Sequence, residues 1–184
     1  MGISGSPRIG SNSEIFLDHT LKPFRSQGWE IKKNLIRNLT IKPRIVCDIC
    51  RETGECAIKD DMAQVYCDFE WCNVLIIASP VYYRNVSAQL LALLQRYYAK
   101  HPQKILSQKV GGVIAVGRST GGGGQSIVVN ILYTWMLSSG MICVPGELNG
   151  LTASADKTGD ILNQPKRLNQ AEILGENMLK LFEK

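Results

Sequence analysis

The distribution of apolar and polar residues divides the chain into alternating strand-like and helix-like segments. Residues 74–78 form a continuous apolar run of strand length, and residues 110–117 form a second apolar strand, as is typical of strands covered on both faces. The other predicted strands are short and lie around residue 3, over 29–35 and over 141–144. Apolar residues recur at helical spacing from the first loop to residue 27 and over 60–69, 86–99, 128–136 and 164–182.

This alternation predicts one mostly parallel sheet with helices on both faces, because a parallel connection crosses the sheet through a long right-handed segment. The length of 184 residues fits a single domain over residues 1–184. In such a sheet, ligands bind at the carboxyl ends of the strands. The loops over 4–13, 79–87 and 117–125 follow the first, third and fourth strands, so we expect them to open on one edge.

Composition and charge indicate which classes of molecule the protein is not expected to bind. The chain is 45% hydrophobic and 20% charged, with a formal charge of +5, and it carries no basic block interleaved with aromatic residues. We therefore expect no nucleic-acid partner. The apolar runs are too short to span a bilayer and the polar start does not resemble a signal peptide, so we expect no membrane association. The six cysteines are then predicted to be thiols or metal ligands in a reducing cytoplasm.

The first loop has the composition of a phosphate-binding loop. Free backbone amides at a helix N-terminus and the positive end of the helix dipole bind phosphate, and small polar side chains add donors. The predicted phosphate residues are Ser4, Ser6, Arg8, Ser11, Asn12 and Ser13. Ser11 stands where a nucleotide hydrolase would have its lysine, so the phosphate is expected to be held and not transferred. The alternative is an ordinary turn followed by an N-cap.

The other two loops suit a flat heterocycle. The loop over 79–87 combines a proline with aromatic side chains, and its predicted ring-lining residues are Pro80, Val81, Tyr82, Tyr83, Arg84 and Asn85. The alternative is that both tyrosines cover the core or a subunit contact. The loop over 117–125 has four successive glycines, which indicates close approach of the backbone to a ligand. Its predicted residues are Arg118, Ser119, Gly121, Gly122, Gly123, Gly124 and Gln125.

These three loops contain no Asp, Glu, His or Cys, so they offer no nucleophile with its base and no pair of carboxylates. A bound cofactor would have to supply the chemistry. A phosphate loop, an aromatic loop and a glycine-rich loop together predict a phosphorylated planar redox ring such as a flavin. Arg118 would place a positive charge near the reduced ring.

The motifs resemble a known family. Gly-Ile-Ser-Gly-Ser-Pro-Arg at 2–8, Ser-Pro-Val-Tyr at 79–82, Val-Ser-Ala-Gln-Leu at 86–90 and Gly-Gly-Gln at 123–125 are similar to the flavodoxin-like NAD(P)H-dependent FMN reductases, especially their iron–sulfur flavoprotein branch. The resemblance covers nearly the whole chain. It implies a three-layer flavodoxin-like fold with a five-stranded parallel sheet, FMN phosphate at 4–13, and the flavin ring between the other two loops. It also implies a homodimer or homotetramer.

A cysteine-rich segment resembles the cluster loop of that branch, which has Cys-x2-Cys-x2-Cys and a fourth cysteine several residues on. Here Cys47, Cys50 and Cys56 fit three of the positions and Arg44 stands at the first. Three thiolates could hold a four-iron four-sulfur cluster with one open iron, or a fourth ligand could come from Cys67, Cys72 or a neighbouring subunit. A zinc site and free thiols are the alternatives. Of these, we favour free thiols.

The expected function follows from the predicted site and the resemblance. It is an FMN-dependent oxidoreductase or electron-transfer flavoprotein, with electrons passing from NAD(P)H or a protein donor such as ferredoxin to a quinone, a flavin or a redox protein. We expect no catalytic side chains, because the flavin itself would carry out the chemistry. The alternative is a non-catalytic FMN-binding or interaction protein on the same scaffold.

Overall fold

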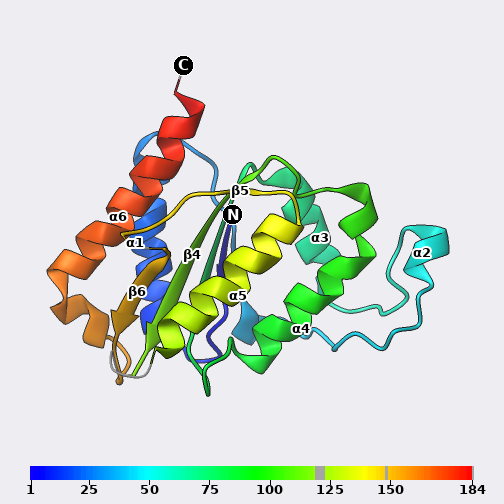
Figure 1. Ribbon diagram of the computed structural model, residues 1–184, viewed down its shortest axis with the longest axis horizontal. Coiled ribbons are helices and arrows are strands. Elements are labelled where there is room, and N and C mark those ends of the chain that lie inside the picture. The colour runs from blue at the N-terminus through cyan, green and yellow to red at the C-terminus, as the bar shows by residue number, and fades with distance from the viewer. Residues whose placement is uncertain (119–122, 148, 184) are drawn as a thin grey trace.

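The structure is a computed structural model that describes residues 1–118, 123–147 and 149–183. It is a parallel sheet between two layers of helices (Figure 1). The strands are β1 (Gly2–Ser4), β2 (Lys33–Leu35), β3 (Val74–Pro80), β4 (Val110–Gly117), β5 (Ile142–Cys143) and β6 (Leu151–Ser154). The helices are α1 (Asn12–Ser26), α2 (Cys50–Thr53), α3 (Met62–Trp71), α4 (Ala88–Arg96), α5 (Gly124–Ser138) and α6 (Pro165–Leu179). The 3₁₀ helices are η1 (Ile36–Asn38), η2 (Tyr97–Ala99), η3 (His101–Gln103), η4 (Asp160–Asn163) and η5 (Lys180–Phe182).

The strands follow the order β2-β1-β3-β4-β5, and every pairing is parallel. This confirms the predicted sheet, with five strands in its main order. The sixth strand, β6, was not predicted. It pairs with the end of β4 (Ile114↔Leu151), whereas β5 pairs with the start of β4 (Val110↔Ile142). Because β3 occupies the other side of β4, β5 and β6 share one edge as two short pieces.

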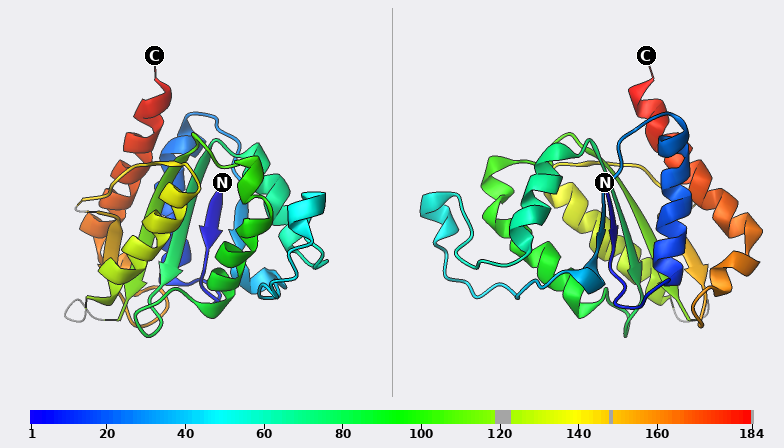
Figure 2. Two further views of the ribbon diagram at one scale, coloured as in Figure 1. Left: turned by 45° about the vertical axis from the view of Figure 1, so that its right-hand side comes forward. Right: turned by 180° about the vertical axis from the view of Figure 1, so that it is seen from behind.

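Alternate residues of the central strands enter two separate cores. Leu75 and Ile77 of β3 pack on the side of α3, α4 and α5, whereas Ile76 and Ala78 pack on the side of α1 and α6. Figure 2 shows these two helical layers on either side of the sheet. All four side chains have no exposed surface, which confirms the prediction of a strand covered on both faces.

The helices start and end close to the predicted positions. Helix α1 ends at Ser26, where the predicted pattern ends at residue 27, and α4 continues into η2 up to the predicted end at Ala99. The segment over 29–35 is regular only in β2, at the edge of the sheet. Within the described ranges, no helix combines the length and apolar composition that a bilayer crossing requires.

The chain between η1 and α3 leaves the body of the molecule. This segment carries α2 and extends outward beside α3 and α4 (Figures 1 and 2). Its two ends are joined, because the Thr40 amide donates to the Asp61 carboxylate at 2.6 Å and the Asp61 amide donates to the Thr40 carbonyl at 3.3 Å. The cysteine segment is therefore a loop whose two ends are hydrogen-bonded to each other.

Candidate functional site

Four loops meet around one cavity at the carboxyl ends of the strands. The cavity has a volume of about 410 Å³, within the range of small-ligand sites, and lies against the loops that follow β1, β3, β4 and β6. Three of these are the loops that the sequence pattern places at one edge. The lining residues are Ser6, Arg8, Ser11, Asn12, Ser13, Pro80, Val81, Tyr82, Tyr83, Val116, Gly117, Arg118, Ala155, Asp156 and Thr158.

The first loop leads into the capped start of α1. The Ser11 hydroxyl accepts a hydrogen bond from the Glu14 amide at 3.2 Å, which makes Ser11 the N-cap. The first backbone bond of the helix runs from the Ile15 amide to the Ser11 carbonyl at 3.0 Å. The amides of Asn12 and Ser13 therefore have no acceptor within the helix. Together with the helix dipole, they favour an anion at this end of the cavity.

Two of the predicted phosphate residues are positioned differently from the rest. The Asn12 side chain donates to the Lys157 carbonyl at 2.8 Å and accepts from the Ile161 amide at 3.2 Å. It fastens the loop after β6 to α1, so only its backbone amide remains for a ligand. Ser4 is fully buried at the end of β1, its hydroxyl has no hydrogen-bond partner, and it does not line the cavity.

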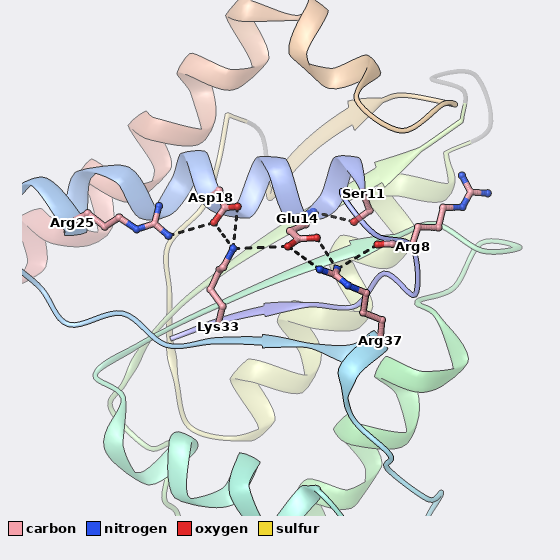
Figure 3. Close-up of polar contacts among 7 residues, drawn as sticks. All are labelled: Arg8, Ser11, Glu14, Asp18, Arg25, Lys33 and Arg37. Atoms are coloured by element: carbon pink, nitrogen blue, oxygen red, sulfur yellow. Dashed lines mark hydrogen bonds and ion pairs between the residues drawn. The ribbon is translucent and has the colours of Figure 1, made fainter.

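A charged network connects the start of α1 to η1 and β2 (Figure 3). Arg37 donates to the Glu14 carboxylate at 2.7 and 3.2 Å and to the Arg8 carbonyl at 3.4 Å. Lys33 contacts Asp18 at 2.8 and 3.0 Å. The hydrogen bond to Glu14 raises the pKa of Arg37, which keeps the guanidinium charged. The negative charge of Glu14, in the first helical turn, is thereby compensated beside the anion site.

The aromatic loop forms a tight turn over the cavity. Tyr82 and Asn85 are bridged by two backbone bonds of 2.9 and 3.0 Å, and the two residues between them have positive φ, 48° at Tyr83 and 63° at Arg84. Left-handed conformations in two successive non-glycine residues are uncommon and cost free energy, and such strain is often found at binding sites. Tyr83 is fully exposed at the tip. The Asn85 side chain accepts from the Val86 amide at 2.8 Å and stabilises the turn.

Two glycines allow these loops to pack together. A Cβ atom at Gly5 would lie 2.6 Å from Leu90 Cδ2, so a larger residue there would force the buried Leu90 side chain or the loop to shift. A Cβ atom at Gly124 would lie 2.9 Å from Val81 Cγ1, which places the start of α5 directly against the aromatic loop. Gln125 reaches the Ala153 carbonyl at 3.4 Å and the Ser154 hydroxyl at 3.3 Å.

The predicted site residues thus fall into three groups. Those that line the cavity are Ser6, Arg8, Ser11, Asn12, Ser13, Pro80, Val81, Tyr82, Tyr83 and Arg118. Those that lie in the same loops or the start of α5 without lining it are Ser4, Arg84, Asn85, Gly123, Gly124 and Gln125. Ser119, Gly121 and Gly122 lie outside the described residues.

Sequence reasoning missed the fourth loop. Ala155, Asp156 and Thr158 follow β6 and line the cavity, and Asp156 accepts a hydrogen bond from Arg118 Nε at 2.7 Å. The three predicted loops do lack acidic residues, but a fourth loop, after a strand that the pattern did not predict, brings one carboxylate to the cavity. The pair also reduces the positive charge that we expected Arg118 to place at the ring. The available signal was the short segment 151–154 followed by Ala-Asp-Lys-Thr-Gly-Asp.

The residues around the cavity fit a phosphorylated planar ring. Hydroxyl groups and helix amides supply hydrogen-bond donors for a phosphate, and the proline and tyrosine side chains supply flat apolar surface. The Asp156 carboxylate is paired with Arg118. Among the described lining residues, no nucleophilic side chain is paired with a histidine or a second carboxylate that could act as its base. The geometry favours the binding and orientation of a cofactor that itself supplies the reactive group.

The three cysteines of the predicted cluster loop do not converge. Cys47 is exposed, whereas Cys50 and Cys56 are half-buried and pack against the core beside α3 and α4. Cys67 is exposed, and Cys72 is buried, which raises the pKa of its thiol. In the described parts of the chain, no three His, Cys, Asp or Glu side chains are grouped as metal ligands. This arrangement fits neither a cluster nor a zinc ion.

The fold and the cavity define a doubly wound α/β protein whose candidate ligand site lies at the carboxyl ends of its strands. The family described as NADPH-dependent FMN reductase matches residues 1–153. An iron–sulfur flavoprotein of Methanocaldococcus jannaschii is 33% identical, over 98% of this chain and 95% of its own. Another, from Methanosarcina thermophila, is 37% identical over 78% of this chain and 75% of its own. The chain belongs to the NADPH-dependent FMN reductase family, on its iron–sulfur flavoprotein branch.

Solved structures show the same fold at low sequence identity. The Trp repressor binding protein of Bacillus subtilis has a TM-score of 0.71 at 20% identity, over 94% of this chain and 98% of its own. An NAD(P)H:quinone oxidoreductase of Methanothermobacter marburgensis has a TM-score of 0.71 at 13% identity, over 96% of each chain. A flavodoxin, WrbA-like protein of Agrobacterium tumefaciens reaches 0.67 at 11% identity, over 98% of this chain and 93% of its own. The flavodoxin-like prediction is confirmed.

Proposed function

We propose that the chain is an FMN-dependent oxidoreductase or electron-transfer flavoprotein. Its electrons would come from NAD(P)H or a protein donor such as ferredoxin and pass to a quinone, a flavin or a redox protein. The main support is the meeting of a helix N-terminus rich in hydroxyl groups with an aromatic turn around one cavity, in a chain of the FMN reductase family. When bound, FMN supplies a ring that accepts and releases electrons.

In this proposal each loop has a separate task. The hydroxyls of Ser6, Ser11 and Ser13 and the amides at the start of α1 hold the phosphate, with Arg8 adding positive charge. Pro80, Val81, Tyr82 and Tyr83 cover the ring and keep water from it. The Arg118–Asp156 pair lies at the polar edge of the ring, where its guanidinium offers donors whose charge is partly compensated.

The test is the identity of the bound flavin. The purified protein should release FMN and not FAD on acid treatment, because the described site has one phosphate loop and no second pyrophosphate site. Flavin-free protein should quench the fluorescence of added FMN strongly and of riboflavin weakly, since riboflavin lacks the phosphate. Protein that binds riboflavin and FMN equally, or neither, would contradict the proposal.

A charge in the phosphate loop sharpens this test. Repulsion between two unit charges ~4 Å apart is on the order of 4 kcal/mol at an effective dielectric constant of ~20, before screening. Ser6→Asp should therefore weaken FMN binding by about 100-fold or more and leave riboflavin binding unchanged. Ser6→Ala is the matched control, which removes only the hydroxyl. Equal losses for FMN and riboflavin in Ser6→Asp would place the phosphate elsewhere.

A measurement of turnover separates the oxidoreductase from the non-catalytic FMN-binding protein. An oxidoreductase should reduce a quinone, free flavin or a ferric acceptor in the presence of NAD(P)H or reduced ferredoxin. A protein that binds FMN but shows no turnover with any of these donors would be a binding protein on the same scaffold.

A further inference from the structure

The cysteine segment departs from the pattern of its branch at the position of the first ligand. Two relatives are iron–sulfur flavoproteins by name, and Arg44 stands at the position where the family resemblance implies a first cysteine. A guanidinium is always protonated and has no lone pair for iron. The segment therefore offers three thiolates at the four positions of the implied pattern.

Arg44 is held by two partners in the structure. Its guanidinium centre lies 4.0 Å from the centroid of the Tyr98 ring, and Nη2 donates to Asp48 Oδ1 at 2.8 Å. Arg51 joins the same group, because its Nε donates to the Tyr98 hydroxyl at 2.8 Å. Four side chains, Arg44, Asp48, Arg51 and Tyr98, thus form a contact that we call the arginine–tyrosine clasp. It joins the outlying segment to the chain after α4.

Further hydrogen bonds and ion pairs join the rest of the cysteine segment to the body of the protein. Lys100 donates to the Glu55 carboxylate at 2.6 Å, and Gln103 donates to the Gly54 carbonyl at 2.9 Å. Arg96 donates to the Asp60 carboxylate at 2.8 and 3.1 Å, in an ion pair whose side chains are 2% and 3% exposed. These hydrogen bonds and ion pairs hold the segment against α4, η2 and η3.

The three remaining cysteines are not grouped as metal ligands within the described residues. Cys47 is exposed, whereas Cys50 and Cys56 are half-buried and pack against the core. From the clasp and from this arrangement, we propose that the segment holds no iron–sulfur cluster in this protein. The arginine–tyrosine clasp takes over the structural role of the metal, and the three cysteines are free thiols.

The first experiment measures iron, acid-labile sulfide and FMN in one anaerobically purified sample. We expect FMN without stoichiometric iron or sulfide, and an absorption spectrum without the broad bands of an iron–sulfur cluster. A thiol reagent should label the exposed Cys47 and Cys67 in the native protein and all six cysteines after unfolding. About four iron and four sulfide per chain would overturn the proposal. Because FMN is measured independently, this outcome is distinguishable from failure of the proposed function.

Variants at position 44 test the cause. Arg44→Cys completes the four-cysteine pattern and should gain iron and sulfide after anaerobic reconstitution, whereas Arg44→Ser, the matched control, should gain neither. An Arg44→Cys protein that keeps its FMN but takes up no cluster would overturn the assignment of Arg44 as the determinant. A cluster in Arg44→Ser would overturn the requirement for a fourth thiolate.

Retention of the clasp is checked separately by proteolysis. Tyr98→Leu should increase the rate of tryptic cleavage at Arg44 and Arg51 by about tenfold, because it removes the ring and the hydroxyl that hold them. Cleavage that is unchanged in this variant would contradict the clasp, since a loop held by metal or by other contacts would not depend on Tyr98.

Discussion

At the start of α1, beside the cavity, Glu14 is paired with a cation from another element. Glu14 lies in the first turn of α1, where a carboxylate stabilises the helix through its dipole. The same carboxylate would oppose a phosphate bound at the helix N-terminus. Arg37 of η1 compensates it with two hydrogen bonds at 2.7 and 3.2 Å and also holds the Arg8 carbonyl. Arg37 is therefore a positioning residue for the phosphate loop.

Replacement of Arg37 tests whether it compensates the charge of Glu14. Arg37→Met leaves the charge of Glu14 uncompensated, and we expect FMN affinity to fall about tenfold, on the order of 1.4 kcal/mol. The double variant Glu14→Gln/Arg37→Met removes both charges and should recover most of the loss. Affinity is measured by quenching of FMN fluorescence at two salt concentrations. A double variant as weak as Arg37→Met would show that Arg37 acts through packing and not through charge.

At the scale of elements, α4 supports both the cavity and the cysteine segment. At its start, the N-cap Ser87 donates through its hydroxyl to the Gly5 carbonyl at 2.6 Å, which fixes the phosphate loop. At its end, Arg96 holds Asp60 and donates to the carbonyls of Lys42 at 2.8 Å and Ile58 at 3.2 Å. Helix α4 therefore holds the first loop of the cavity at one end and the outlying cysteine segment at the other.

The Asp60–Arg96 pair should contribute strongly to stability and give it a pH dependence. Burial by itself raises the pKa of Asp60, but hydrogen bonds from Arg96 and from the amides of Lys42 and Met62 outweigh burial and hold the pKa below the usual 3.8. A lowered pKa means that the stabilisation is complete above about pH 4 and is lost as the pH falls through the folded value.

The variant Asp60→Asn leaves the Arg96 guanidinium buried without its counter-charge. We expect it to lower the free energy of unfolding by about 3 kcal/mol at pH 7. Urea denaturation at pH 7 and at a series of pH values down to 3 measures both effects. In Asp60→Asn the loss of stability between pH 4 and 3 should be smaller than in the parent chain. An identical pH profile in the two proteins would show that other carboxylates cause the acid sensitivity.

At the scale of the whole molecule, the cavity lies at one edge of the sheet and is open to a second reactant. Its described lining carries two cations, Arg8 and Arg118, and Arg118 is paired with Asp156. The homodimer or homotetramer expected from the family resemblance stays a prediction, as does a cytoplasmic location. In the proposed function, the electron donor and the acceptor would both approach the bound flavin at this edge.

This charge distribution predicts weak discrimination between NADH and NADPH. Recognition of a 2′-phosphate requires an uncompensated cation, and in the described lining Arg8 is the candidate, already assigned to the FMN phosphate. We expect the two nucleotides to reduce the bound flavin with rates within about fivefold, a difference of about 1 kcal/mol. Stopped-flow measurement of flavin bleaching provides the test. A preference of a hundredfold would contradict this expectation and would make Arg84 the first residue to replace.

The layered α/β fold and most of the residues that line the cavity could be predicted from the amino-acid pattern. Apolar runs such as 74–78 report burial on both faces, and the loops that follow parallel strands must meet at one edge whatever the details of packing. Ser6, Ser11, Pro80 and Tyr82 line the cavity for this reason. These inferences depend on periodicity and local turn chemistry, which are written in neighbouring residues.

Contacts between residues that are distant in the chain could be found only in the folded structure. The short β6 pairs with β4 without a strong apolar pattern of its own, so the position of Asp156 at the cavity was not predicted. The Asn12 side chain bonds the loop after β6, and the Arg44 guanidinium lies over the Tyr98 ring. Each of these contacts joins residues far apart in the chain, and its free energy depends on a geometry that no local pattern encodes.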